Sequence, residues 1–263
     1  MEKILLSDSI GLEIRCVDLS REIPNDLWNE IHLAWLEHKV IVLRNQNLSD
    51  EDQLRFARSF GELQTVRTAT DIVGENQSIM HVANRPVGGK PGILPDGEMQ
   101  FHNDQSYYEC PCKATTLYSI KIPDEGGNTL FLNTAKAYAA LPMEDKVKLR
   151  GLHVLNVYDY GKNPTVKGEK YNPDAPNFSH PIVIKHPETG EPALFTSRLM
   201  SHHIEGMCDE QGDVLLKSLF DHAEDSAFIY EHIWQVGDLV LWDNFSCQHA
   251  RTYFDPDKTR ILR

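Results

Sequence analysis

Residues 101–131 read FHNDQSYYECPCKATTLYSIKIPDEGGNTLF, and this stretch contains the pattern that decides the fold. Two of its segments, 114–122 and 128–132, are rich in β-branched, aromatic and aliphatic residues, which is typical of strands. The segment between them, 123–127, begins with proline and ends with two glycines, which indicates a turn. Residues 99–108 also have strand character in their aromatic side chains. The stretch therefore predicts a β-rich core.

Short strands and a few helices are expected on both sides of this stretch. Residues 25–38 have the apolar pattern of an amphipathic helix, and Ser49 with Asp52 resembles a capping box at the start of a second helix. The irregular segment 64–100 predicts a functional loop that covers a site. Many short strands after two early helices indicate an α+β domain built on a β-sandwich or barrel. The other expected strands are 11–19, 40–44, 78–82, 152–158, 181–186, 193–197, 228–234 and 238–242, and the other expected helices are 134–149 and 213–223.

The length, composition and charge limit the class of protein. A chain of 263 residues, 41% of them hydrophobic, predicts a single domain over residues 1–263 with its own core. The formal net charge of −13 disfavours nucleic acid as a partner. The chain has no run of about 18 apolar residues and its first residues do not resemble a secretory signal, so we expect neither a membrane partner nor export. The five scattered cysteines are expected to be free thiols in a reducing cytoplasm.

Three residues have the pattern of a metal site. In a strand, His102 and Asp104 project from the same face, so their side chains can converge on one point. His249 is the best candidate for a third ligand, at the end of the strand 238–242 or in the loop beyond it. Two histidines and one carboxylate with open positions favour non-haem Fe(II) that activates O₂. A zinc-dependent hydrolase could use the same ligands, and a non-catalytic β-sandwich that binds a metal or another ligand is a third interpretation.

A second set of residues could hold a carboxylate group. Thr129 follows the glycine turn at the start of a strand, and Arg260 lies eleven residues after His249. Arginine offers two parallel donors to a carboxylate, and a threonine hydroxyl adds a third. A dicarboxylate that is bound there by one end could chelate the metal with its other end.

Two motifs resemble the taurine/2,4-dichlorophenoxyacetate dioxygenase family of Fe(II)- and 2-oxoglutarate-dependent oxygenases. The stretch 101–131 is similar to the segment of this family that runs from W-H-x-D to G-G-D/N-T. Residues 237–260, GDLVLWDNFSCQHARTYFDPDKTR, are similar to W-D-N-R-x-x-x-H followed eleven positions later by Arg. The resemblance covers essentially the whole chain, and the two motifs together are highly specific.

The resemblance implies a fold, a reaction and a set of site residues. The fold is a double-stranded β-helix, or jelly roll, flanked by helices. The reaction hydroxylates a C–H bond of a small organic substrate with O₂ and converts 2-oxoglutarate to succinate and CO₂. A halogenase is not expected, because a small residue would replace Asp104 there. Oligomers are common in the family, so a homo-oligomer is an open expectation. The implied iron ligands are His102, Asp104 and His249, and the implied contacts of 2-oxoglutarate are Thr129 and Arg260.

The motifs leave the substrate open, but several residues are candidates for binding it. Glu98 holds the place of an asparagine in taurine-type members, and its carboxylate suits an amino-bearing substrate. Those members also have a second arginine four residues beyond the first, whereas Arg263 lies only three residues beyond Arg260, which argues against sulfonate recognition. The candidate contacts for an acidic substrate are Arg67, Arg85, Arg198 and Arg251.

Overall fold

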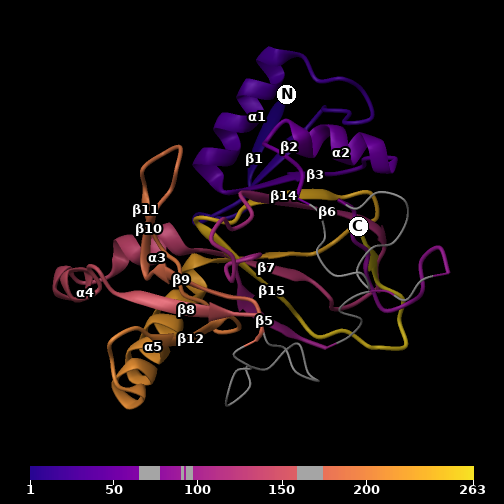
Figure 1. Ribbon diagram of the computed structural model, residues 1–263. Coiled ribbons are helices and arrows are strands. Elements are labelled where there is room, and N and C mark those ends of the chain that lie inside the picture. The colour runs from indigo at the N-terminus through magenta and orange to yellow at the C-terminus, as the bar shows by residue number, and fades with distance from the viewer. Residues whose placement is uncertain (65–77, 90–91, 93–96, 159–173) are drawn as a thin grey trace.

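The computed structural model describes residues 1–64, 78–89, 92, 97–158 and 174–263 (Figure 1). It has the mixed helix and strand composition that the sequence predicts. Much of the segment 64–100, which was expected to be a covering loop, lies outside these residues, and so does Arg67. Among the helices of the described part, none is both long and apolar enough to cross a membrane.

A seven-stranded sheet has the spatial order β1 (Glu2–Leu5), β2 (Leu12–Arg15), β3 (Val40–Leu43), β14 (Leu239–Asp243), β6 (Ala114–Lys121), β16 (Ile261–Leu262) and β4 (Val82–Ala83). Strand β14 lies between β3 and β6 and is antiparallel to both, although the three strands come from distant parts of the chain. Strand β3, VIVL, is buried at every position, as expected for a strand that is covered on both faces.

A four-stranded antiparallel sheet has the order β13 (Ile229–His232), β7 (Thr129–Asn133), β15 (Cys247–Arg251) and β5 (Met99–His102). Two smaller sheets consist of β12 (Ser201–Ile204), β8 (His153–Val157) and β9 (Asn177–Pro181), and of β10 (Val183–Lys185) and β11 (Pro192–Leu194). The sequence did not predict β1, β12, β15 or β16, and the expected strand 181–186 overlaps β9 only at Pro181. These pairings place residues from the middle and the end of the chain on one four-stranded surface.

The two larger sheets share a core of apolar side chains. Val240 and Trp242 of β14 belong to the same buried cluster as Phe131 of β7 and Cys247 of β15. The ring centroids of Phe131 and Trp242 lie 5.5 Å apart. The four-stranded sheet is therefore packed against a rigid layer, since buried side chains in such a core interlock closely.

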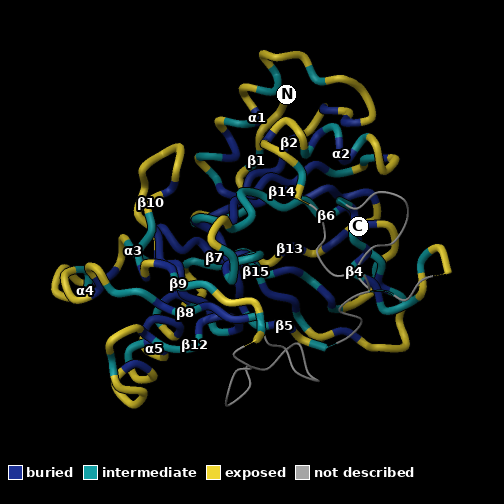
Figure 2. The backbone as a smooth tube through the Cα atoms, in the orientation of Figure 1, coloured by how far each residue is buried: buried dark blue, intermediate teal, exposed yellow. Residues whose placement is uncertain are grey.

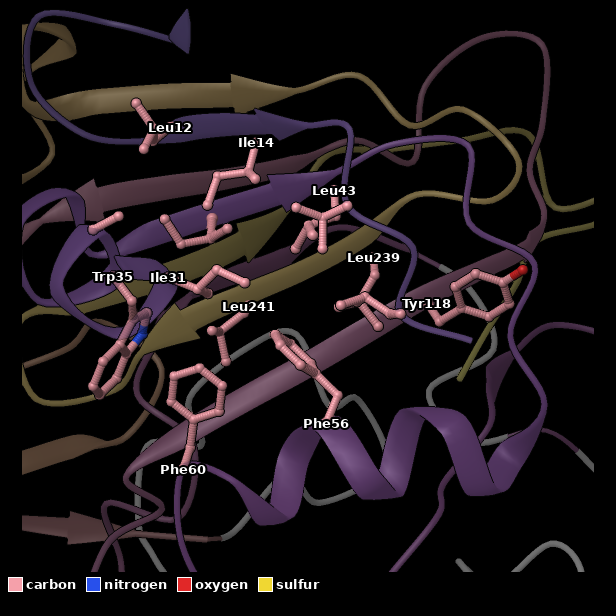
Figure 3. Close-up of a cluster of buried hydrophobic side chains, with 14 of the residues drawn as sticks. Leu12, Ile14, Ile31, Trp35, Leu43, Phe56, Phe60, Tyr118, Leu239 and Leu241 are labelled. Carbon is pink, nitrogen blue, oxygen red and sulfur yellow. The ribbon is translucent and has the colours of Figure 1, made fainter. Parts of the chain in front are cut away.

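Helices α1 (Asn25–His38) and α2 (Asp50–Arg58) cover the opposite face of the seven-stranded sheet (Figures 1 and 3). Trp35 of α1 and Phe56 of α2 pack there with Leu241. Both helices begin where the sequence predicts. The capping box at the start of α2 is confirmed, because the side chains of Ser49 and Asp52 each accept a hydrogen bond from the backbone N–H of the other residue.

A third group of elements packs on the outer face of the four-stranded sheet. Helices α3 (Thr134–Ala140), α4 (Met143–Lys148) and α5 (Asp209–Ala223) lie on this side with the three-stranded sheet (Figure 1). Leu132 of β7 and Phe220 of α5 belong to one buried cluster. Figure 2 shows the buried residues concentrated along the strands, whereas α4 is largely exposed.

The expectation of one helix over 134–149 is wrong, because the chain forms α3 and α4 instead. Leu141, which separates them, is extended with ψ 144°, and Pro142 caps α4. Proline has no backbone N–H to donate and disfavours a helical conformation in the residue before it. Pro142 therefore ends one helix and begins the next.

Candidate metal centre

The side chains of His102, Asp104 and His249 converge on one point. His102 and His249 are directly opposite each other in the antiparallel pair β5 and β15, and their ring centroids lie 4.1 Å apart. Asp104 Oδ1 lies 3.9 Å from His102 Nε2 and 3.8 Å from His249 Nε2. One ligand atom from each residue lies within 4.8 Å of the others. Metal bonds of about 2.0–2.2 Å place neighbouring ligand atoms about 3 Å apart, so a small inward movement would let all three contact one ion.

Two details of this geometry differ from the expectation. Strand β5 ends at His102, so Asp104 is placed by a turn and not by strand alternation. In this turn Gln105 has a left-handed φ of 59°, and the Asn103 amide donates hydrogen bonds to the carbonyls of Asn244 (2.7 Å) and Cys247 (3.1 Å). His249 lies inside strand β15, whereas the sequence predicted a strand end or loop.

Both histidines are in the form that binds a metal. Nδ1 of His102 lies 2.9 Å from the carbonyl of Gln100, so an Nδ1–H donor there leaves the Nε2 lone pair facing Asp104 and His249. Burial lowers the pKa of His102. Burial and the neighbouring His102 lower the pKa of His249 to about 3. The site is therefore ready for a cation at neutral pH, because metal ligands must be deprotonated.

The metal-free protein should lose stability as the pH falls from 7 towards 5. In this range an unfolded histidine, with a pKa near 6.5, binds a proton, whereas folded His249 stays neutral until about pH 3. The unfolded state then binds more protons, so stability decreases as the pH is lowered. Urea unfolding at pH 7 and pH 5 in the presence of a chelator measures this decrease. The decrease should be smaller in His249→Gln and unchanged in His153→Gln; an equal decrease in wild type and His249→Gln would contradict the assignment.

 

Thr129 and Arg260 lie in the same cavity as the His-Asp-His cluster. A single cavity of about 540 Å³ is lined by both of these residues and by His102, Asp104 and His249. Thr129 is the first residue of β7, where it lies opposite Arg251 of β15 and His232 of β13. Such a volume is within the usual range for small-molecule sites. The structure therefore brings all five residues of the implied metal and 2-oxoglutarate sites together.

Arg260 is a buried cation with free donors. Its Nε donates to the carbonyl of Gly127 at 2.9 Å, and the residue is 3% exposed. Within the described part of the chain, no residue accepts a hydrogen bond from its terminal Nη atoms, and no carboxylate forms an ion pair with it. Burial and the charge of Arg251 lower its pKa to about 9, so it stays positive at neutral pH. An uncompensated buried charge is costly, so this environment suits an anionic ligand.

The structure explains why the turn before Thr129 contains two glycines. Gly126 and Gly127 both have positive φ, 72° and 65°, which favours glycine. A Cβ atom on Gly127 would lie 2.9 Å from Cδ and 3.0 Å from Nε of Arg260. Only glycine at this position therefore lets the turn support the guanidinium at its observed place.

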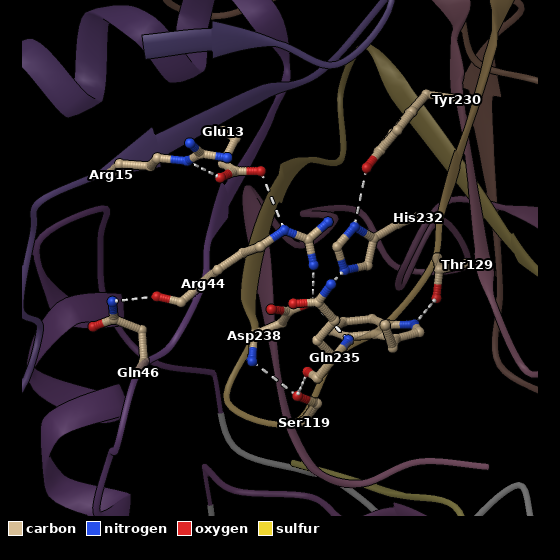
Figure 4. A network of polar contacts seen from close by, with 11 residues as sticks. Glu13, Arg15, Arg44, Gln46, Ser119, Thr129, Tyr230, His232, Gln235 and Asp238 are labelled. Atoms are coloured by element: carbon tan, nitrogen blue, oxygen red, sulfur yellow. Dashed lines mark hydrogen bonds and ion pairs between the residues drawn. The ribbon is translucent and has the colours of Figure 1, made fainter. Parts of the chain in front are cut away.

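A buried polar network lies behind Thr129 (Figure 4). The indole N–H of Trp234 donates to Thr129 Oγ1 at 3.0 Å. The His232 ring packs edge-on against the Trp234 ring at 4.6 Å and contacts Asp238 through Nε2 at 3.1 Å. Arg44 donates to the same Asp238 oxygen at 2.7 Å. The sequence gives no sign of this role of Trp234, since nothing in the motif connects it to Thr129.

Of the candidate substrate contacts that lie in the described part of the chain, only Arg251 lines the cavity. Its Nε donates to the carbonyl of Gly97 at 3.0 Å. Glu98 is exposed and is not part of the cavity wall. Arg85 lies on the described segment 78–89, where it donates to backbone carbonyls at 3.0 Å, among them that of Pro256.

The expectation for Arg198 is not supported by its position. Its guanidinium pairs with Glu224 at 2.9 Å and with Asp221 at 3.1 Å. It also packs over the ring of Phe220 on α5, at 5.2 Å from the centroid. These contacts direct the charge to the outer helix, away from the cavity wall.

Comparisons with known proteins identify a family that the chain matches. The family model described as "Taurine catabolism dioxygenase TauD, TfdA family" matches residues 5–263. The chain is 31% identical to (S)-phenoxypropionate/alpha-ketoglutarate-dioxygenase of Sphingobium herbicidovorans, over 98% of this chain and 91% of that protein. It is 29% identical to an alkylsulfatase of Acinetobacter baylyi, over 98% of this chain and 82% of that protein.

Solved structures of members of the same family resemble this chain. A taurine dioxygenase from Burkholderia xenovorans superposes with a TM-score of 0.84 and 26% identity, covering 99% of this chain and 86% of that one. The expectation of a 2-oxoglutarate-dependent dioxygenase, with Fe(II), 2-oxoglutarate and O₂, is confirmed at the level of the family. The match over nearly the whole length shows that the chain belongs to the TauD, TfdA family of 2-oxoglutarate-dependent dioxygenases.

Proposed function

We propose that residues 1–263 act as one dioxygenase domain with a double-stranded β-helix (jelly-roll) core. The two larger sheets would form this core, since they share the buried cluster that contains Phe131 and Trp242. Strands β5 and β15 of the four-stranded sheet would present His102 and His249, and the turn after β5 would present Asp104. A cytoplasmic location is part of the proposal and is supported by the five cysteines, which are all free.

In this proposal His102, Asp104 and His249 hold Fe(II), and Arg260 with Thr129 holds the distal carboxylate of 2-oxoglutarate. The observation that carries it is that a buried arginine with free donors and a His-Asp-His cluster line one cavity. When bound, the metal and cosubstrate supply the oxidising chemistry that hydroxylates a C–H bond with release of succinate and CO₂. The protein residues orient the two ligands and exclude water from the buried side of the cavity.

The hydroxyl of Thr129 is oriented to donate. An indole N–H is a donor only, so Thr129 Oγ1 accepts from Trp234 and its own hydrogen is free to point elsewhere. A carboxylate next to Arg260 is an acceptor only. Trp234 would therefore support a charge-assisted hydrogen bond from Thr129 to 2-oxoglutarate.

Thr129→Ala should weaken 2-oxoglutarate binding by about 5- to 150-fold, which corresponds to about 1–3 kcal/mol for the loss of a hydrogen bond to a charged group. Trp234→Phe should have a smaller effect, and no effect when Thr129 is already alanine. Anaerobic titration of the metal-loaded protein with 2-oxoglutarate measures both. Trp35→Phe is the matched control, because the buried indole N–H of Trp35 has no partner among the described residues. Unchanged affinity in Thr129→Ala would remove Thr129 from the site.

The walls of the cavity indicate the type of substrate. Tyr107 and Tyr158 line it with ring centroids 4.5 Å apart, and Met99 and Met200 are also part of the wall. Arg251 adds a positive charge. We therefore propose a small substrate with an apolar or aromatic body and an acidic group. The expectation of an amino-bearing substrate rested on Glu98, and it loses this support because Glu98 is not part of the cavity wall.

Two relatives are named for substrates of this type, (S)-phenoxypropionate and 2,4-dichlorophenoxyacetate. The test is succinate formation with Fe(II), ascorbate and 2-oxoglutarate in the presence of aryloxy acids, other carboxylates, sulfate esters or amines. At least one acid should stimulate succinate formation, and Arg251→Gln should raise the KM for this acid more than it lowers kcat. Stimulation by amines alone would contradict the proposed substrate class.

A further inference from the structure

We infer that Thr115, oriented by Asn244, is a positioning residue that holds one oxygen of Asp104 and leaves only the other for the metal. This inference rests on the proposed role of Asp104 as a metal ligand. It concerns the number of coordination positions of the metal that protein atoms fill. The identity of the three ligand residues does not decide this number, because a carboxylate can bind with one oxygen or with two.

The two oxygens of Asp104 have different surroundings. Oδ1 is the oxygen that lies 3.9 Å and 3.8 Å from the Nε2 atoms of His102 and His249. Oδ2 accepts a hydrogen bond from the hydroxyl of Thr115 at 2.6 Å. One oxygen is therefore directed to the metal position, while the other is held by the protein.

The direction of this hydrogen bond is fixed by Asn244. Its Oδ1 faces two backbone or ring donors, the N–H of Asp104 at 3.3 Å and the indole N–H of Trp242 at 3.2 Å. Its Nδ2 must then face Thr115, to which it donates at 2.8 Å. A hydroxyl that accepts from an amide has its single hydrogen left to donate, and here the acceptor is Asp104 Oδ2.

These groups belong to a rigid part of the molecule. Thr115 of β6 and Trp242 of β14 are direct partners in the seven-stranded sheet, and Asn244 follows two residues later. Asn244 is fully buried, and its backbone N–H donates to the carbonyl of Lys113 at 3.1 Å. The position of the Asp104 carboxylate is therefore determined by the seven-stranded sheet, although the two histidines come from the four-stranded sheet.

Holding Oδ2 has a consequence for the metal. A carboxylate can bind a metal with one oxygen or with both. A facial set of three protein ligands leaves three open positions, whereas a carboxylate that used both oxygens would leave only two. Thr115 would thus keep available a position that 2-oxoglutarate and O₂ need.

The test measures Mn(II) binding by the full chain with Thr115→Val, which keeps the shape of the side chain, and Thr115→Ser, which keeps the hydroxyl. Loss of a residue that supports a metal ligand typically weakens metal affinity about 10- to 100-fold. We expect this loss in Thr115→Val and, as a second variant that cannot clash, in Thr115→Ala. Thr115→Ser should stay within about threefold of wild type. Thr116→Val is the matched control, because the Thr116 hydroxyl contacts Gln53 and not Asp104.

A second measurement tests the number of open positions. Water-proton relaxation by the Mn(II)-loaded protein should fall by about one third in Thr115→Val, since one of three open positions would be taken by the second carboxylate oxygen. Wild-type affinity in Thr115→Val and Thr115→Ala, an equal loss in Thr115→Ser, or unchanged relaxation would overturn the inference. A wild-type protein that does not bind Mn(II) through His102 and His249 would instead contradict the proposed function.

Discussion

Arg260→Ala should weaken 2-oxoglutarate binding by about 30- to 3,000-fold. Removing one partner of a buried, hydrogen-bonded charge pair typically costs about 2–5 kcal/mol, and each 1.4 kcal/mol corresponds to a factor of about ten. Arg260 is buried, its Nε is fixed by the Gly127 carbonyl, and its terminal donors are free for a carboxylate. Arg260→Lys should retain part of the affinity, because lysine replaces two parallel donors with a point charge.

Anaerobic titration of the metal-loaded variants with 2-oxoglutarate gives the dissociation constants. Metal affinity should change little in Arg260→Ala, since Arg260 is not part of the His-Asp-His cluster. Arg85→Ala is the matched control, because Arg85 contacts backbone carbonyls outside the cavity wall. If Arg260→Ala bound 2-oxoglutarate as wild type does, the carboxylate anchor would lie elsewhere, and Arg251 would be the next residue to test.

Asp104→Ala should reduce metal affinity by at least about 100-fold, more than the loss expected for residues that only support a ligand. The carboxylate supplies the negative charge of the cluster, and two neutral histidines remain without it. Hydroxylation should be lost with the metal. Titration with Mn(II) or Fe(II) measures the change. Glu109→Ala, which removes an exposed carboxylate nearby, should bind metal as wild type does; a similar result for Asp104→Ala would rule out Asp104 as a ligand.

The sequence predicts the local elements of this fold well. The helix over 25–38 is found with the same bounds, and the capping box at Ser49 is present. Both depend on neighbouring residues, so the information is local. The one helix expected over 134–149 fails for a local reason as well, since the effect of Pro142 was not considered.

The site was predicted by motifs more than by geometry. Strand alternation gave a wrong reason for the convergence of His102 and Asp104, because Asp104 lies in a turn held by Asn103. Contacts between distant segments could not be predicted from the sequence. Thr115 and Asn244, for example, meet only because β6 and β14 pair. The cation Arg198 is neutralised by Glu224, the residue that caps the C-terminal end of α5. The packing of this helix depends on contacts between distant segments, which no single segment of the sequence encodes.

The central claim is that one cavity binds a metal through His102, Asp104 and His249 and the distal carboxylate of 2-oxoglutarate through Arg260. A crystal structure with Mn(II) and the analogue N-oxalylglycine tests it most directly. We predict one ligand atom from each of the three residues at about 2.0–2.3 Å from the metal, and the analogue's distal carboxylate within about 3.2 Å of Arg260 Nη atoms. A metal bound by other residues, or a distal carboxylate without contact to Arg260, would contradict the claim.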